Sequence, residues 1–472
     1  MKQSLPVGLD YWEIKQQENR EQMVFFLNGN MIHNNRSSSS GMMCRAYQSG
    51  AWGLASSALA DSPTLGRICS KAASNAALLA RHRTGKQILL PSNPARGEYL
   101  FYTKKQPWSF AQRRDFVQDL DNYIHTKYPG LSTRQLGIRQ DETEKHIITS
   151  DGGEMHVMIP RSFLYVLMVD KGPEGPVQGY RALGGFGQFE DIYSDPKEVY
   201  EELEKVYQET QDMKDTVYAQ AGSFDCVLDS RLAGILAHEA VGHTTEADFV
   251  LNGSIAGDYL NQAVGSPLVS LIDVAHTYAD TICPVPVFID DEGTLAEDCV
   301  IIDKGILKSY MHNKESAAML GMQLTGNARG HCFYDEPLIR MRNTMIVPGK
   351  DKLAEMIASI EEGYYLVESN NGQADATSEF MFGIALGYEV KNGKLGKAIK
   401  STTMSGVAFD LLKTVTMVSD DMYWTASGMC GKKQSIQVGM GGPAIKCASI
   451  WGVSNGKDLQ KTDRPSVGAG GR

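Results

Sequence analysis

The chain has few cysteines for its length, and none of them forms a CxxC pair. The eight cysteines are scattered over 472 residues. In a chain of this size such spacing is typical of reduced thiols, and it excludes the disulfide framework of a small secreted domain. A single cysteine can still bind a metal, so a metal site is not excluded.

Long apolar runs and basic runs are also missing. The longest purely apolar run, residues 163–169, is far shorter than a membrane span. Residues 1–6 contain no apolar segment of the kind found in a secretory signal, which predicts a cytoplasmic protein with no membrane partner. The formal net charge is −10, and no basic run extends beyond Arg81-His82-Arg83 and its neighbours. This balance argues against nucleic acid as the main partner.

The sequence does have the length and apolar content for more than one core. A chain of 472 residues with 42% hydrophobic residues predicts two domains, or at most three. We expect an α+β protein, with an N-terminal α/β domain over residues 1–221 and a β-rich domain over residues 222–472. The second domain is expected to be a barrel or a wrapped sheet that carries the metal site, because turns separate many short β-branched segments in it.

Local patterns predict the main helices and two connections. The serine-rich segment 37–41 is expected to be a polar loop, and the glycine-rich segment 172–187 is expected to be a connection between elements. Apolar periodicity and capping residues predict helices at 61–80, 110–128, 196–211, 348–362 and 405–418.

Two histidines and a glutamate lie in an apolar, helix-like run at residues 236–243. Histidine nitrogens bind metals, and an adjacent glutamate can take a proton from a water molecule on the metal. Zinc peptidases commonly have these histidines four apart on one helical face. Here His238 and His243 are five apart, which leaves them about 140° out of register in an ideal α-helix. A π-bulge, or a helix that ends between them, would bring the rings together. Gly242 best permits either because it has no Cβ and tolerates unusual dihedral angles.

The same motif has a purely structural explanation. A histidine in an apolar helix is more often a packed core residue than a ligand, and the wide spacing is compatible with no site at all. The neighbouring sequence favours a site. Residues 231–237 are small and apolar and should be buried, and histidine and glutamate need partners when they are buried. The chain becomes polar directly after His243.

A catalytic zinc site needs a third protein ligand and an open position. Glu246 and Asp248 follow the histidines too closely for the usual arrangement, in which this ligand comes from a separate element. Cys430 is the strongest candidate, because flanking glycines let the backbone approach a site and the nearby cation Lys432 would favour the thiolate. A plain core cysteine is the alternative. Three other histidines are explained as surface or turn residues: His276, His312 and His331.

Three segments together resemble the TldD/PmbA family, whose members were once described as modulators of DNA gyrase. The first two are similar to the TldD-type branch, which carries the metal. The resemblance covers nearly the whole chain. The segments are His238-Glu239-Ala240-Val241-Gly242-His243, Gly428-Met429-Cys430-Gly431-Lys432 and Val438-Gly439-Met440-Gly441-Gly442-Pro443.

The resemblance implies a zinc metallopeptidase that hydrolyses unfolded or flexible peptides. His238, His243 and Cys430 would hold Zn²⁺, and Glu239 would be the catalytic base. The protein would act as a homodimer, or as a heterodimer with a PmbA-type (TldE) paralogue that lacks the metal residues. Two other classes remain open: a non-catalytic partner or scaffold subunit, and a zinc amidase that acts on small molecules in a narrow, closed pocket.

Overall fold

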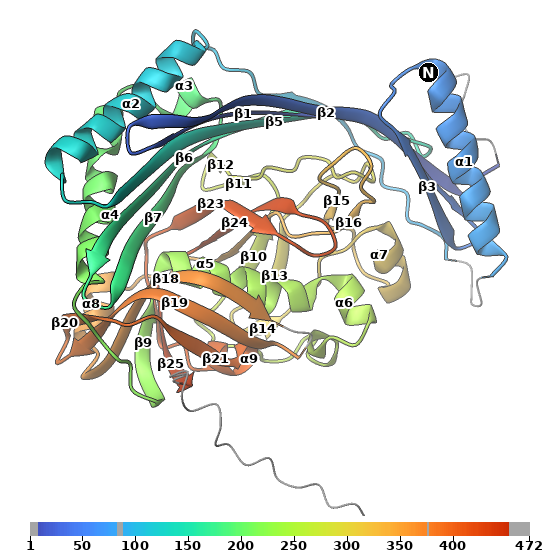
Figure 1. The fold of residues 1–472 in the computed structure, drawn as a ribbon. Helices are drawn as coiled ribbons and strands as arrows, with labels where there is room; N and C mark the ends of the chain where they lie inside the picture. The colour runs from blue at the N-terminus through green and yellow to red at the C-terminus, as the bar shows by residue number, and fades with distance from the viewer. Residues whose placement is uncertain (1–7, 83–87, 375–376, 453–472) are drawn as a thin grey trace, which may run out of the picture.

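The computed structural model describes residues 8–82, 88–374 and 377–452. Residues 1–6, on which the prediction of no secretory signal rests, lie outside these ranges. The described part of the chain is a mixed α/β protein, which confirms the predicted class. A long first sheet arches over the sheets formed by the later half of the chain (Figure 1).

Seven strands form the arched sheet, in the order β3-β2-β1-β5-β6, and both β4 and β7 pair with β6. Neighbouring strands are antiparallel, except that β4 runs parallel to β6. The strands are β1 (Tyr11–Leu27), β2 (Asn30–Gln48), β3 (Ala51–Ser57), β4 (Arg96–Leu100), β5 (Thr133–Thr149), β6 (Glu154–Gly172) and β7 (Gly175–Phe186).

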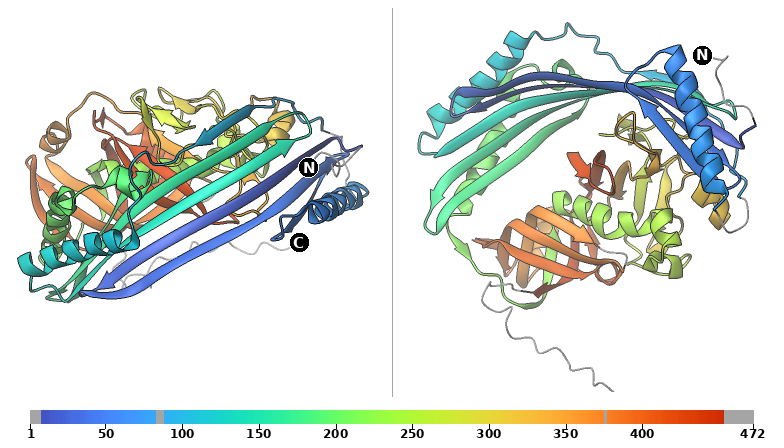
Figure 2. Two further views of the ribbon diagram at one scale, coloured as in Figure 1. Left: turned by 90° about the horizontal axis from the view of Figure 1, so that it is seen from above. Right: turned by 45° about the vertical axis from the view of Figure 1, so that its right-hand side comes forward.

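Helices α1 (Ser62–Ala80) and α2 (Phe110–Lys127) lie at opposite ends of the arched sheet (Figure 2). Each begins at a polar cap: Asp61 accepts a hydrogen bond from the backbone of Thr64, and Ser109 does so from Gln112. Both helices match their predictions. The predicted helix at 196–211 is a 3₁₀ turn (Pro196–Val199) that continues as α4 (Tyr200–Asp212), and it follows the short α3 (Phe189–Ile192).

Two predicted connections are strands. Segment 37–41 lies inside β2, where Ser37 pairs with Glu21 and Ser40 with Glu18, so its polar side chains belong to an exposed part of the ladder. Most of the glycine-rich segment 172–187 is β7, which pairs along its length with β6. A Cβ at Gly184 would lie 2.2 Å from the carbonyl oxygen of Ser162, so glycine here allows close strand pairing.

The later half contains two larger sheets and two small ones. Among the described residues none of them closes into a barrel, which corrects the barrel form of the prediction. The six-stranded sheet has the order β14-β13-β10-β17-β24-β23. Its strands are β10 (Leu271–Val274), β13 (Cys299–Asp303), β14 (Ile306–Leu307), β17 (Asn343–Ile346), β23 (Tyr423–Cys430) and β24 (Ile436–Gly442).

The eight-stranded sheet has the order β18-β9-β25-β21-β19-β20-β8, with β22 also paired to β25. Its strands are β8 (Thr216–Val217), β9 (Gly222–Leu228), β18 (Glu362–Ala374), β19 (Glu379–Lys391), β20 (Lys394–Ile399), β21 (Thr402–Val407), β22 (Met417–Val418) and β25 (Ile445–Gly452). The small hairpins pair β11 (Thr277–Tyr278) with β12 (Thr281–Ile282) and β15 (Ala328–Arg329) with β16 (Leu338–Ile339).

Helices in the later half are short. The predicted helix at 348–362 is only α8 (Leu353–Ala358), and the one at 405–418 is α9 (Ala408–Lys413), because its first residues extend strand β21. The others are α5 (Ser230–Leu236), α6 (Ala247–Leu251) and α7 (Lys314–Leu320). No helix within the described ranges is long and apolar enough to cross a membrane.

Helix α5 packs between the two larger sheets and contacts β24 on one side and β18 on the other. A Cβ at Gly234 would lie 3.0 Å from backbone atoms of β24, so the small residues of this helix permit a close approach. Leu232, Ala233 and Leu236 are fully buried. The predicted burial of the segment that leads into the histidines is confirmed, and it fixes the position of the next helical turn.

Buried ion pairs join the inner face of the arched sheet to the later half of the chain. Lys15 on β1 and Lys145 on β5 both contact Asp291, at 3.1 and 2.7 Å. Arg45 on β2 contacts Glu292 at 2.9 Å. The division of the chain into domains 1–221 and 222–472 stays a prediction.

Candidate metal centre

The helix that carries the histidines changes its geometry at the motif. Regular α-helix ends at Leu236, a π-helical turn covers Ala237–Gly242, and a 3₁₀ turn covers His243–Thr245. A π-turn holds an extra residue, so positions five apart come to lie on one face. The rings of His238 and His243 are accordingly 5.1 Å apart between centroids. The predicted π-bulge is confirmed.

Of the two reasons predicted for Gly242, the tolerance of unusual dihedral angles was wrong and the absence of a Cβ is confirmed. Its dihedral angles are ordinary helical values, φ −56° and ψ −53°, so the turn does not need a residue that tolerates unusual backbone conformations. A Cβ at this position would lie 2.1 Å from the sulfur of Met341. A side chain at this position would therefore have to displace the buried Met341 side chain, which packs directly against the π-helical turn.

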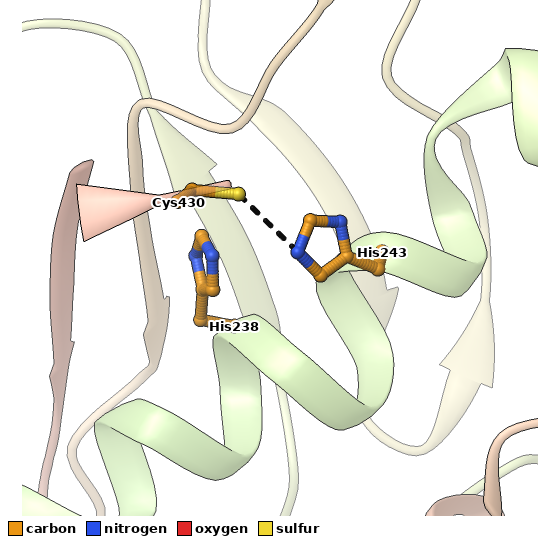
Figure 3. A group of neighbouring side chains, drawn as sticks. All are labelled: His238, His243 and Cys430. Carbon is orange, nitrogen blue, oxygen red and sulfur yellow. Dashed lines mark hydrogen bonds between the residues drawn. The ribbon is translucent and has the colours of Figure 1, made fainter. Parts of the chain in front are cut away.

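Cys430, the last residue of β23, lies beside the two histidines although it is far away in the sequence (Figure 3). Its Sγ is 3.3 Å from Nε2 of His243. One ligand atom from each of His238, His243 and Cys430 lies within 4.8 Å of the others. Arg340 donates a 2.8 Å hydrogen bond to the Cys430 carbonyl and so holds the end of the strand. The structure thus brings together the three residues predicted as ligands.

These three side chains fit a zinc ion. His238 is 1% exposed, and neither of its ring nitrogens has a hydrogen-bond partner among the described residues. An imidazole buried without a partner is unfavourable unless something else satisfies it. Burial raises the pKa of the Cys430 thiol, but the adjacent His238 and His243 outweigh this and lower the pKa to about 3. A thiolate and two imidazoles are ordinary zinc donors and leave a fourth position open.

Acidic residues surround His243 and fix its position and that of Lys432. Glu246 is fully buried, and its carboxylate lies 2.8 Å from Nδ1 of His243. Burial lowers the pKa of His243, but Glu246 and Cys430 outweigh this and raise the pKa to about 10. Lys432 contacts Glu246 at 3.1 Å and Asp248 at 2.8 Å. Lys432 therefore supports these carboxylates, whereas the sequence suggested that it acts on the Cys430 sulfur.

Glu239, the predicted base, lies next to the three donors without belonging to their group. Its carboxylate is 3.8 Å from Nε2 of His243, and its side chain is 25% exposed. It can therefore meet both solvent and a group bound at the centre. The other histidines considered from the sequence lie outside the donor group: His276 stacks on Phe288, His312 contacts Ser316, and His331 is beside Lys145.

Family models and relatives match this chain over much of its length. The model described as the PmbA/TldA metallopeptidase C-terminal domain matches residues 221–451, and that described as PmbA/TldA metallopeptidase domain 1 matches residues 12–76. A zinc metalloprotease TldD homolog of Saccharolobus solfataricus is 31% identical over 332 residues, 69% of this chain and 72% of that protein. The chain belongs to the TldD/PmbA metallopeptidase family.

Further comparisons agree with this TldD/PmbA membership. A metalloprotease of Methanocaldococcus jannaschii is 29% identical over 448 residues, which cover 94% of this chain and 96% of that protein. The names of these relatives support a peptidase-type activity and a bound metal. The crystal structure of TldE from Thermococcus kodakarensis covers 94% of this chain and 96% of its own, with a TM-score of 0.73 and 15% identity. At that identity the likeness shows a shared fold.

Proposed function

We propose that this TldD/PmbA protein is a zinc-dependent peptidase that hydrolyses unfolded or flexible peptides bound in extended form. The observation that carries the proposal is the convergence of His238, His243 and Cys430, whose ligand atoms lie within 4.8 Å of one another. Metal-assisted hydrolysis can use two imidazoles, a thiol of low pKa and a neighbouring glutamate. A scaffold subunit has no need of these groups.

In this proposal each side chain has a separate task. His238, His243 and Cys430 hold the zinc, which when bound lowers the pKa of a water molecule and polarises the scissile carbonyl. Glu239 accepts a proton from the attacking water at its carboxylate and then delivers it to the leaving amine. Glu246 orients the imidazole of His243 through Nδ1. The buried surroundings of His238 exclude bulk water from that side of the centre.

A strand edge that has no paired partner among the described strands supports the proposed binding of peptide as an added strand. Strand β23 stands at the end of the six-stranded sheet and pairs there only with β24 among the described strands. It ends at Cys430, one of the proposed ligands. Pairing with such an edge reads the backbone of a peptide, tolerates many side chains and requires an extended chain. We therefore expect unfolded substrates to be cleaved and folded proteins to be spared.

We further propose that the protein works in the cytoplasm as a homodimer or as a heterodimer with a PmbA/TldE-type paralogue. The support is the shared fold of a TldE structure, which covers nearly the whole chain. Two subunits of one fold can pair through equivalent surfaces. In this proposal residues 222–472 carry the hydrolytic chemistry and residues 1–221 form the second domain.

The test is digestion of casein, an unstructured protein, and of a stably folded protein by the zinc-loaded full chain, alone and mixed with a TldE-type protein. We expect casein to be cleaved, the folded protein to survive, and a chelator to stop the reaction. Cys430→Ala is the matched inactive control. Intact casein in both mixtures would refute the proposed activity, and equal cleavage of the folded protein would refute the extended-peptide specificity.

A further inference from the structure

The outer face of the arched sheet is apolar near the two ends of its strands and polar between them. On β1 the outward residues Ile14 and Val24 pack against helices, whereas the outward residues between them are polar. On β5 the same change runs from Ile138 through polar residues to Ile148. Figure 2 shows that α1 and α2 lie at the two ends of the sheet and that neither helix crosses the strands between them.

Two histidines and a glutamate meet in this polar middle. Lys145 and Ile147 on β5 face inward, toward Asp291 and Ile289, so the alternating residues Glu144 and His146 face outward. Strand β6 places His156 directly opposite His146. The two imidazole rings stack with their centroids 3.6 Å apart.

One ring nitrogen of each histidine lies near the same carboxylate oxygen of Glu144. Oε1 of Glu144 lies 3.1 Å from Nε2 of His156 and 3.9 Å from Nε2 of His146. One ligand atom from each of the three residues lies within 4.8 Å of the others. The side chains are 21%, 23% and 51% exposed for Glu144, His156 and His146, so an ion can reach them from solvent.

Neighbouring charged groups orient these donors. Glu98 on β4, paired with His156 across the sheet, lies 3.2 Å from its Nδ1. This contact leaves Nε2 of His156 facing Oε1 of Glu144, where a cation between the two atoms would bind both. Arg20 binds the other oxygen of Glu144 and leaves Oε1 directed at the histidines. The carboxylate–histidine pairing is the same device that Glu246 and His243 form at the inner centre.

We propose that Glu144, His146 and His156 form a second metal site, separate from the centre at Cys430, which binds a divalent transition-metal ion on the outer face of the sheet. Two imidazoles and one carboxylate are a zinc donor set, and imidazole also suits the neighbouring ions of the first transition row. The ion would link β5 to β6. Glu98 would act as a positioning residue for His156.

Cobalt binding to the full chain tests the site, because Co²⁺ bound at the two centres would give different absorption spectra. A thiolate ligand gives a sulfur-to-metal charge-transfer band, which only the centre with Cys430 can produce. His146→Ala/His156→Ala should bind about one ion fewer than the unmodified chain and keep this band. Cys430→Ser should lose the band and keep an ion bound through nitrogen and oxygen. His33→Ala/His125→Ala, which removes two exposed histidines elsewhere, should match the unmodified chain.

The measurement separates this site from the proposed peptidase centre. Equal cobalt binding by His146→Ala/His156→Ala and the unmodified chain would overturn the outer site and leave the inner one intact. Absence of the charge-transfer band from the unmodified chain would count against the inner centre alone. Since His146 is half exposed, the single variant His146→Gln keeps the test valid if the double variant is unstable. It should weaken the binding of the second ion without changing the thiolate band.

Discussion

Nδ1 of His243 lies 2.8 Å from Oε2 of Glu246, a carboxylate that is fully buried. When a metal displaces the proton from Nε2, the atom that faces Cys430 at 3.3 Å, this contact keeps the remaining proton on Nδ1. A carboxylate in this position fixes the orientation of a ligating imidazole and makes it more basic. Glu246 therefore prepares His243 for a metal without being a ligand.

Replacing Glu246 by glutamine should lower zinc affinity by about 10- to 100-fold, because the amide can still accept a hydrogen bond but carries no charge. Competition with a chelator of known affinity measures the change. Asp248→Asn is the matched control, since Asp248 contacts Lys432 and not His243. Unchanged zinc affinity in Glu246→Gln would remove Glu246 from the metal centre.

Cys430→Ala should lose most of the zinc and keep its fold, because two imidazoles alone bind the ion much more weakly than the complete set of donors. Elemental analysis of the purified protein gives the zinc content. Cys332→Ala removes a half-buried thiol that lies outside the donor group, and it should keep the zinc of the unmodified chain. Undiminished zinc in Cys430→Ala would refute the ligand assignment.

Glu239→Gln separates catalysis from metal binding at one residue. It should keep its zinc, because Glu239 lies beside the donor group and not within it. Hydrolysis of a flexible peptide should fall by at least ~10²-fold, the usual scale for loss of a general base. Glu201→Gln, on an exposed face of α4, should be fully active. Normal turnover by Glu239→Gln would exclude Glu239 as the base, and loss of zinc would make it a ligand.

Helices whose ends are set by local sequence could be predicted. Strands whose conformation depends on pairing with a distant strand were harder to predict. Asp61 and Ser109 mark the helix starts, and both helices form as predicted. The segment 37–41 reads as a loop because serines are common in loops, but its conformation is set by β1, to which it pairs. Amino-acid composition does not reveal which distant segment a strand pairs with. It also does not show that a polar segment such as 37–41 continues a long strand.

At the metal centre the spacing of His238 and His243 required a departure from α-helical geometry, and the π-turn supplies it. The position of Cys430 could not be derived from spacing, because it depends on how β23 packs beside α5; the family resemblance pointed to it. The role of Glu246 was missed. Its separation of three residues from His243 is a recognisable signal only when the chain is known to stay helical through Thr245.

Asp291 should contribute strongly to stability, because it is 3% exposed between Lys15 and Lys145. Asp291→Ala leaves both lysines without this partner and should cost about 3–5 kcal/mol of unfolding free energy in denaturant titrations. Asp303→Ala, at an exposed position, should cost little. A loss below about 1 kcal/mol for Asp291→Ala, the scale of a surface pair, would contradict the prediction.

The pKa of Asp291 predicts how the stability of the fold changes in acid. Burial raises the pKa of Asp291, but Lys145 and Lys15 outweigh it and lower the pKa to about 2. A folded-state pKa below the unfolded value of about 3.9 gives stability that is present at neutral pH and is lost as the pH falls toward 2. Acid titrations of the unmodified chain and of Asp291→Ala should therefore converge at low pH.

Gly242 offers a test of how packing sets the helical turn. Gly242→Ala forces a Cβ against Met341, and such overpacking typically costs about 1–3 kcal/mol, so zinc binding and thermal stability should both fall. If the contact is the cause, Met341→Ala should relieve it, and Gly242→Ala/Met341→Ala should recover zinc affinity beyond the sum of the single effects. A glycine required for its dihedral angles would show no such rescue. Zinc affinities of the four proteins give the coupling energy, and a value near zero would reject the steric explanation.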